Sequence, residues 1–168
     1  MSDPQNLSEL YLEELQDLWS ANDQMSRMVD DMAGVISDAK LKEQMTHSVR
    51  GIRKHTDTLK ELIEDANGEC KSEHCKGMEG LVAEARKHTI EADNDGAVKD
   101  VVAITQFQRM SHYGIAGFGT AKAFAEALGK TEAAGKLDEI TKDIYACDDY
   151  LSELAERSRN LDALERTS

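Results

Sequence analysis

A single proline, Pro4, occurs in the 168 residues of the chain. Proline inside a helix removes a backbone hydrogen bond and clashes with the preceding turn, so nearly the whole chain lacks the strongest helix breaker. Apolar residues recur at spacings of three, four and seven over four long stretches, which is the period of an amphipathic α-helix. This pattern predicts an all-α protein built from four long helices.

The first two helices are bounded by residues that favour helix ends. The first is expected over about 7–32, with Asn6 as its N-cap, Glu9 completing a capping box and Gly34 just beyond its end. Ser37 is expected to cap the second helix, because its hydroxyl can accept a hydrogen bond from the first turn. This second helix continues to about Ala66.

The last two helices are predicted in the same way. One extends over about 98–128 and closes at Gly129, and the other follows Thr131 as its cap and continues to about Arg157. Between the two pairs of helices lies a connection, residues 67–97, with a polar loop, a short amphipathic helix around Met78 and an acidic turn.

The length of this connection predicts the topology. Short links produce antiparallel neighbours, whereas a long connection can cross the bundle and leave the helices on either side of it parallel. We therefore expect one ferritin-like four-helix bundle domain over residues 1–168, with a crossover at about 67–97 that carries a short extra helix. An up-down-up-down bundle with an excursion is the alternative.

The charge balance and the lack of long apolar stretches argue against two classes of partner. The formal net charge is −13 and no cluster of Lys and Arg could neutralise a run of phosphates, so nucleic acid is not expected to bind. No apolar stretch is long enough for a bilayer, and the first residues, MSDPQNLSEL, lack the features of a signal peptide. The odd number of three cysteines fits a reducing compartment, and we expect a cytoplasmic protein without membrane contact.

Four segments carry a resemblance to a known family: DLWSANDQM at 17–25, CKGMEGL at 75–81, QRMSHYGIAGFGT at 108–120 and AFAEALGKTEAAGKL at 123–137. They resemble the YciE/YciF family of ferritin-like bacterial proteins, and with the helix lengths the resemblance covers nearly the whole chain. It implies a ferritin-like bundle that forms a homodimer, is linked to bacterial stress responses and often carries a di-metal centre in its middle.

Most carboxylates that the resemblance implies at such a centre are replaced in this chain. The family usually has glutamate at two positions occupied here by Asn22 and Gly51. Two acids of its third helix correspond to Ser111 and Gly114, and a glutamate of its fourth helix corresponds to Ile144. Two neighbouring cations need several anionic oxygens, so these departures from the family pattern predict a largely lost di-metal centre, and a site without bound metal is the favoured expectation.

His55 and Asp148 are the remaining candidate metal ligands. His55 stands where the family often has glutamine or histidine, and Asp148 keeps an acid of the fourth helix. Together with Asn22, or with Glu14 two turns earlier, they could hold one zinc, iron or copper ion. The favoured interpretation is a buried hydrogen-bonded pair of His55 and Asp148, because buried polar groups need partners.

The loop sequence CKSEHC raises a second metal hypothesis, since it places Cys70, His74 and Cys75 together. A closed zinc site needs four ligands and usually a tighter cysteine spacing. Two ordinary thiols are therefore the favoured interpretation, and a Cys70–Cys75 disulfide is the other alternative.

Three functions remain open, and no catalytic residue is predicted for any of them. The first is a stress-associated bundle with a structural or interaction role. The second is an iron- or manganese-binding protein with oxidase or peroxide-related activity through altered ligands. The third is a small-ligand-binding bundle: a central cavity could form if Asn22, Gly51, Ser111 and Gly114 face one another, unless methionines fill the space.

Overall fold

The computed structural model describes residues 4–70, 74–94 and 96–165, and within these ranges all regular structure is helical. The elements in chain order are α1 (Leu7–Val35), α2 (Ala39–Asp65), α3 (Lys76–Thr89), α4 (Gly96–Ala127), α5 (Thr131–Leu154), a π-helical segment η1 (Ala155–Arg159) and α6 (Asn160–Glu165). The predicted all-α class is confirmed, and the four predicted long helices correspond to α1, α2, α4 and α5.

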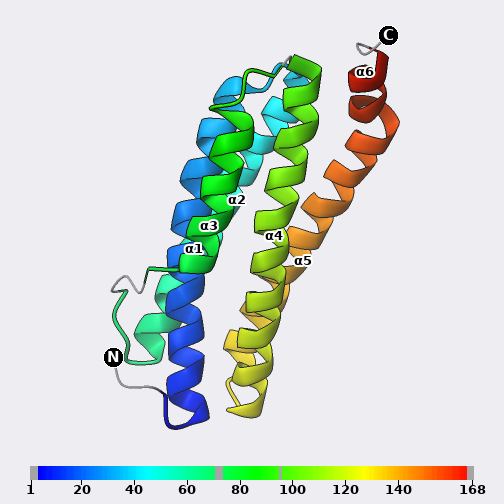
Figure 1. Ribbon diagram of the computed structural model, residues 1–168. Coiled ribbons are helices and arrows are strands. Elements are labelled where there is room, and N and C mark those ends of the chain that lie inside the picture. Colours follow the sequence, from blue (N-terminus) through cyan, green and yellow to red (C-terminus); the bar gives the residue numbers. More distant parts are fainter. Residues whose placement is uncertain (1–3, 71–73, 95, 166–168) are drawn as a thin grey trace.

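The direction of the helices follows from the crossover (Figure 1). In this view α1 runs upward and α2 runs down beside it, α3 leads the chain back up, α4 runs down and α5 returns upward. α2 and α4 therefore run in the same direction, as predicted for a ferritin-like bundle, and the up-down-up-down alternative is wrong. The short helix α3 packs against α1 and α4.

The cap of α2 differs from the prediction. Asp38, not Ser37, is the N-cap, and its Oδ1 accepts a hydrogen bond from the Leu41 backbone N–H at 2.8 Å. The Ser37 hydroxyl instead donates to Oδ2 of Asp100 in α4 at 2.7 Å. The Ser37 hydroxyl thus bonds a residue of a distant helix and does not cap α2. The local sequence gives no sign of this contact.

The other helix ends agree with the prediction in part, and Gly34, which was expected just beyond the first helix, lies inside α1. Asn6 caps α1 as predicted, with its Oδ1 accepting from the Glu9 N–H at 3.0 Å. Thr131 is the first residue of α5 and not its cap, because the cap position is Lys130, whose side chain makes no capping hydrogen bond. Beyond Leu154 the helix widens into η1, which nothing in the sequence predicted.

The apolar core is divided into two halves. The half beside α3 contains these buried residues of four long helices, among others: Met28, Met32, Met45, Ile104 and Leu151. The half at the opposite end contains, among others, Tyr11, Leu15, Leu59, Phe118 and Leu137. Polar residues and glycines occupy the level between the two halves, and the candidate site lies there.

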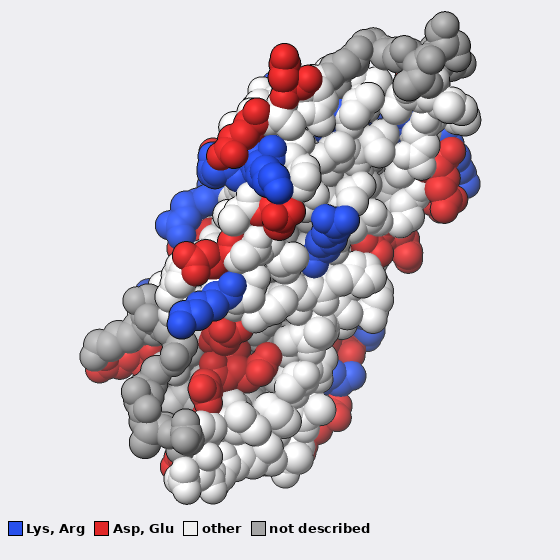
Figure 2. Space-filling view, viewed as in Figure 1, with Lys and Arg blue, Asp and Glu red and all other residues white. Residues whose placement is uncertain are grey.

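The surface seen in the same view is unevenly charged. Acidic and basic side chains lie interspersed over α3 and the upper part of the molecule, while the lower part of α4 is nearly uncharged (Figure 2), in agreement with the lack of Lys, Arg, Asp and Glu in residues 110–121. None of the described helices combines the length and apolarity needed to cross a membrane.

Candidate functional site

A cavity of about 400 Å³ lies at the level where the two halves of the core meet. It opens between α2 and α5, which touch each other only loosely, because α5 leans away from the bundle toward its C-terminal end (Figure 1). Its wall includes all four residues expected to face a central cavity, which are Asn22 of α1, Gly51 of α2, and Ser111 and Gly114 of α4.

Glycines provide part of this space. A Cβ atom built at Gly51 would meet no atom within 4 Å. One built at Gly114 would meet Ile144 Cδ1 at 3.7 Å, which is ordinary van der Waals contact. Protein interiors are normally close-packed, so the open space beside Gly51 at the centre of a bundle is unusual.

Asn22 lines the cavity and carries a buried, unpaired donor. The residue is only 5% exposed, and its Nδ2 has no hydrogen-bond partner in the part of the chain that the structure describes. A buried polar group without a partner costs free energy, because it has left water without a replacement. This amide is the most distinctive polar group of the site.

His55 lies on the cavity wall with a different partner from the one expected. Its Nε2 is 3.4 Å from Oδ2 of Asp143 in α5, and its ring meets Phe118 edge-on, with centroids 6.3 Å apart. Burial lowers the pKa of His55 below its ordinary value of 6.5, and the hydrogen bond and charge of Asp143 only partly oppose this effect. The imidazole is therefore neutral at neutral pH.

Asp148 does not pair with His55, so the predicted buried pair is wrong. Asp148 Oδ2 lies 3.1 Å from Nε2 of His112 in α4, whose side chain is 59% exposed. The reason is helical geometry: residues five positions apart on a helix point about 140° away from each other. α5 therefore presents Asp143 to α2 and Asp148 to α4.

The predicted metal ligands do not assemble into a cluster. Glu14 is not part of the cavity wall. Its Oε1 lies beside Gly117, 3.1 Å from where a Cβ atom built on that glycine would stand. Among the residues described, no three side chains of the His, Cys, Asp and Glu types come together where an ion could bind. The cavity wall offers two imidazoles, of His47 and His55, and one carboxylate, of Asp143, and this set does not fit a dinuclear centre, which needs several anionic oxygens.

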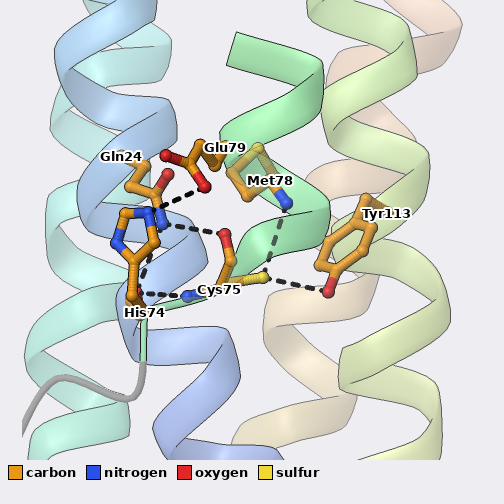
Figure 3. Close-up of polar contacts among 7 residues, drawn as sticks. Gln24, His74, Cys75, Met78, Glu79 and Tyr113 are labelled. Atoms are coloured by element: carbon orange, nitrogen blue, oxygen red, sulfur yellow. Dashed lines mark hydrogen bonds and ion pairs between the residues drawn. The ribbon is translucent and has the colours of Figure 1, made fainter. Parts of the chain in front are cut away.

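A second polar cluster surrounds Cys75 at the start of α3 (Figure 3). The thiol is buried, and its Sγ lies 3.0 Å from the Tyr113 hydroxyl and 3.2 Å from Asp17 Oδ2. The Tyr113 hydroxyl also donates to Asp17 Oδ2 at 2.9 Å. Burial is the main cause that raises the pKa of both Cys75 and Tyr113, so both groups stay protonated and Cys75 is a poor nucleophile.

This cluster fixes the start of α3 on α1. Gln24 Nε2 donates to the Cys75 carbonyl at 3.1 Å, and the Cys75 N–H donates to the Ser20 hydroxyl at 3.0 Å. His74 turns toward Glu79, with 3.2 Å between Nε2 and Oε2, and away from the Cys75 thiol (Figure 3). Cys70 and Cys75 are free thiols, so the disulfide alternative is wrong.

Two carboxylates of these clusters were missed from the sequence. Asp143 lies three residues after Ile140 and four before Cys147, so its helical spacing could have placed it on the inward face of α5. Asp17 is separated from Cys75 by 58 positions, and no local pattern reveals that contact.

Comparisons with known proteins agree with the resemblance noted in the sequence. The family model described as "Domain of unknown function (DUF892)" matches residues 6–164. Protein YciF of Escherichia coli (strain K12) is 30% identical over 150 residues, which cover 89% of this chain and 90% of that protein.

Solved structures give the same result. The crystal structure of the E. coli stress protein YciF matches with a TM-score of 0.88 and 29% identity, over 94% of this chain and 99% of that one. YcfI from Rhodopseudomonas palustris matches with a TM-score of 0.84 and 24% identity, over 90% and 96% of the two chains. The second similarity concerns the fold alone.

Proposed function

The chain belongs to the DUF892 family, which includes proteins like E. coli YciF, and from this premise we propose that it is a non-catalytic, stress-associated bundle that has lost a di-metal centre. The link to stress comes from the description of YciF as a stress protein. The role left for such a bundle is structural or interaction-based.

One observation supports the loss of the centre. Four helix positions that line the central cavity are occupied by Asn22, Gly51, Ser111 and Gly114, none of which can supply an anionic oxygen. The resemblance implies carboxylates at these positions, and a carboxylate at each would place negative charge from three helices around one space. Two divalent cations at this level would lack the charge that normally balances them.

The test is elemental analysis of the untagged full chain by mass spectrometry. The protein is purified from cells grown with added iron and manganese, then incubated with ferrous iron and oxygen and desalted. We expect far less than one metal ion per chain both in the purified protein and after the incubation with ferrous iron. About two ions per chain would overturn the proposal and favour oxidase or peroxide-related chemistry.

An intermediate result has its own meaning. One ion per chain that disappears in His55→Gln would support a mononuclear iron or manganese site through altered ligands and contradict the proposal. One ion per chain that persists in His55→Gln would indicate a metal site away from His55. The central cavity would then hold no metal, as proposed.

A variant with restored acids serves as the positive control. The substitutions Asn22→Glu, Gly51→Glu, Ser111→Glu and Ile144→Glu return carboxylates to positions where the resemblance implies them. If missing acids are the reason for weak metal binding, this variant should gain bound iron. A folded variant that still binds none would contradict the assigned cause.

A further inference from the structure

The central cavity has the size and wall of a small-molecule site. Its volume of about 400 Å³ falls within the roughly 300–1,000 Å³ of typical ligand pockets. Apolar side chains form much of the wall, among them Met25, Ile52, Phe107 and Ile144. Such a wall offers dispersion contacts to a guest with an apolar body.

The wall also carries one unused donor. Asn22 is 5% exposed, and no described residue accepts a hydrogen bond from its Nδ2. An acceptor on a bound molecule would give this amide the partner that the protein itself does not supply. Because the rest of the wall is largely apolar, this single contact would fix the orientation of the guest.

The charges around the cavity select an uncharged guest. Among the described residues no Lys or Arg lines the wall, and the whole chain carries a net charge of −13, which disfavours an anionic guest. Asp143, the only carboxylate that the described part of the chain contributes to the wall, has a 66% exposed side chain and already pairs with His55. A buried cation would therefore lack a free anionic partner.

The entrance lies on the side of the bundle where α2 meets α5. Cys147 Sγ there accepts from Gln44 Nε2 at 3.5 Å and lies 3.4 Å from the Ser48 hydroxyl. Thiols form weak hydrogen bonds. This rim can therefore open at little cost while the α1–α2 and α4–α5 pairs remain intact.

From these observations we propose that the cavity binds a small, uncharged, mostly apolar molecule with one hydrogen-bond acceptor, and that the side-chain amide of Asn22 recognises the acceptor. This activity goes beyond the structural role proposed above and does not depend on it, since a metal-free bundle could equally have a filled or an empty centre.

The test uses two probes of matched shape. 2-Acetylnaphthalene carries a carbonyl acceptor, and 2-isopropylnaphthalene has nearly the same shape without it. Each is titrated into the full chain with ¹³C-methyl-labelled methionine and followed by NMR, with Met25 as the reporter at the cavity and Met78 in α3 as the distant reference. We expect saturable shifts of Met25, and a ratio of ketone to hydrocarbon affinity that falls about 3- to 10-fold when the Asn22 donor is removed, the effect of one hydrogen bond.

Two results of this titration would overturn the proposal. If neither probe gives a saturable shift at Met25, the cavity does not bind this class of molecule. If the ratio of the two affinities is the same in Asn22→Leu as in the wild type, Asn22 does not recognise an acceptor.

Three variants localise the effect. Asn22→Leu removes the donor at similar volume and should lower the affinity of the ketone relative to that of the hydrocarbon. Gly51→Leu places a side chain where a built Cβ meets open space, and it should abolish binding of both probes. Gly80→Leu is the matched control, because its Cβ also meets no atom within 4 Å but lies on α3, outside the cavity wall.

Leucine favours a helix more than glycine does, so both glycine variants should fold, and circular dichroism verifies this. Retained binding in folded Gly51→Leu, or lost binding in folded Gly80→Leu, would show that the probes bind elsewhere.

Discussion

His55 shows at the scale of a single residue how burial and pairing act in opposite directions. Burial disfavours the imidazolium, the Asp143 carboxylate favours it, and burial has the larger effect, so the pKa of His55 is lowered from 6.5. As the pH falls below 6.5, the unfolded chain takes up this proton more readily than the folded chain. The free energy of unfolding therefore decreases on acidification through this window.

His55→Gln should remove this contribution to acid destabilisation. We expect the stability of the wild type to fall more than that of the variant between pH 7 and pH 5, as measured by urea unfolding at several pH values. His88→Gln is the control, because His88 is exposed and lies beside Glu84 in α3. A variant with the same pH dependence as the wild type would contradict the assignment.

Glu14→Gln should show the opposite sign. Burial, followed by Asp17 and Glu13, raises the pKa of Glu14 above 4.5, so the unfolded chain ionises first as the pH rises. The variant should be more stable than the wild type by roughly 0.5–1 kcal/mol at pH 7, with the gain vanishing near pH 4. Thermal unfolding at both pH values measures this, and exposed Glu43→Gln should change neither.

At the scale of elements, one carboxylate holds the turn between α1 and α2 from a third helix. Asp100 of α4 is 1% exposed and accepts hydrogen bonds from the Ser37 N–H at 2.9 Å, the Ser37 hydroxyl at 2.7 Å and the Asp38 N–H at 3.0 Å. Asp38 also pairs with Arg159 of η1 at 2.9 Å. The turn, the start of α4 and the C-terminal segment are thus fixed at one point.

Asp100→Asn should destabilise the fold by about 2 kcal/mol, because an amide has one acceptor oxygen where the carboxylate has two, and one buried donor loses its partner. Chemical denaturation at pH 7 gives the difference. Asp93→Asn is the matched control, since Asp93 is exposed in the turn before α4. Equal stabilities of the two variants would show that the Asp100 contacts contribute nothing.

The predictions from sequence succeeded where local patterns decide the structure. The apolar period located the four long helices, and the length of the crossover gave their directions. The cap at Asp38 and the partner of His55 could not be predicted, because each depends on a residue 62 or more positions away, Asp100 and Asp143. The family resemblance singled out Gly51 and Gly114 as positions of lost carboxylates, but the sequence does not distinguish a cavity at these positions from a repacked core.

Packing is uneven at the scale of the whole molecule. α1 contacts α2, α3 and α4, and most of its residues between Ser20 and Ala33 are buried. In α5, by contrast, none of the residues between Ile140 and Leu151 is fully buried, because the helix leans away from α2 beside the cavity. The free energy needed for local opening should therefore differ between these two helices.

Native-state hydrogen exchange measures this difference. Amides of 142–150 should exchange about 10- to 100-fold faster than those of 20–29, because their helix loses fewer buried contacts when it opens. Mass spectrometry of peptic fragments or NMR resolves the two segments. Equal protection would mean that α5 opens only with the whole molecule.

The two short links of the chain also have a kinetic consequence. Residues 36–38 close the α1–α2 hairpin and residues 128–130 close the α4–α5 hairpin, so the entropic cost of closing each loop is small. The His55–Asp143 contact, by contrast, joins positions 88 apart in the chain. The contacts between α2 and α5 should therefore form after the transition state of folding. Asp143→Ala, which removes the contact of α5 with His55 of α2, is then expected to speed unfolding in stopped-flow experiments and leave the folding rate unchanged. A guest that bridges α2 and α5 in the cavity would have the opposite effect on unfolding, prolonging the life of the folded chain without hastening its formation.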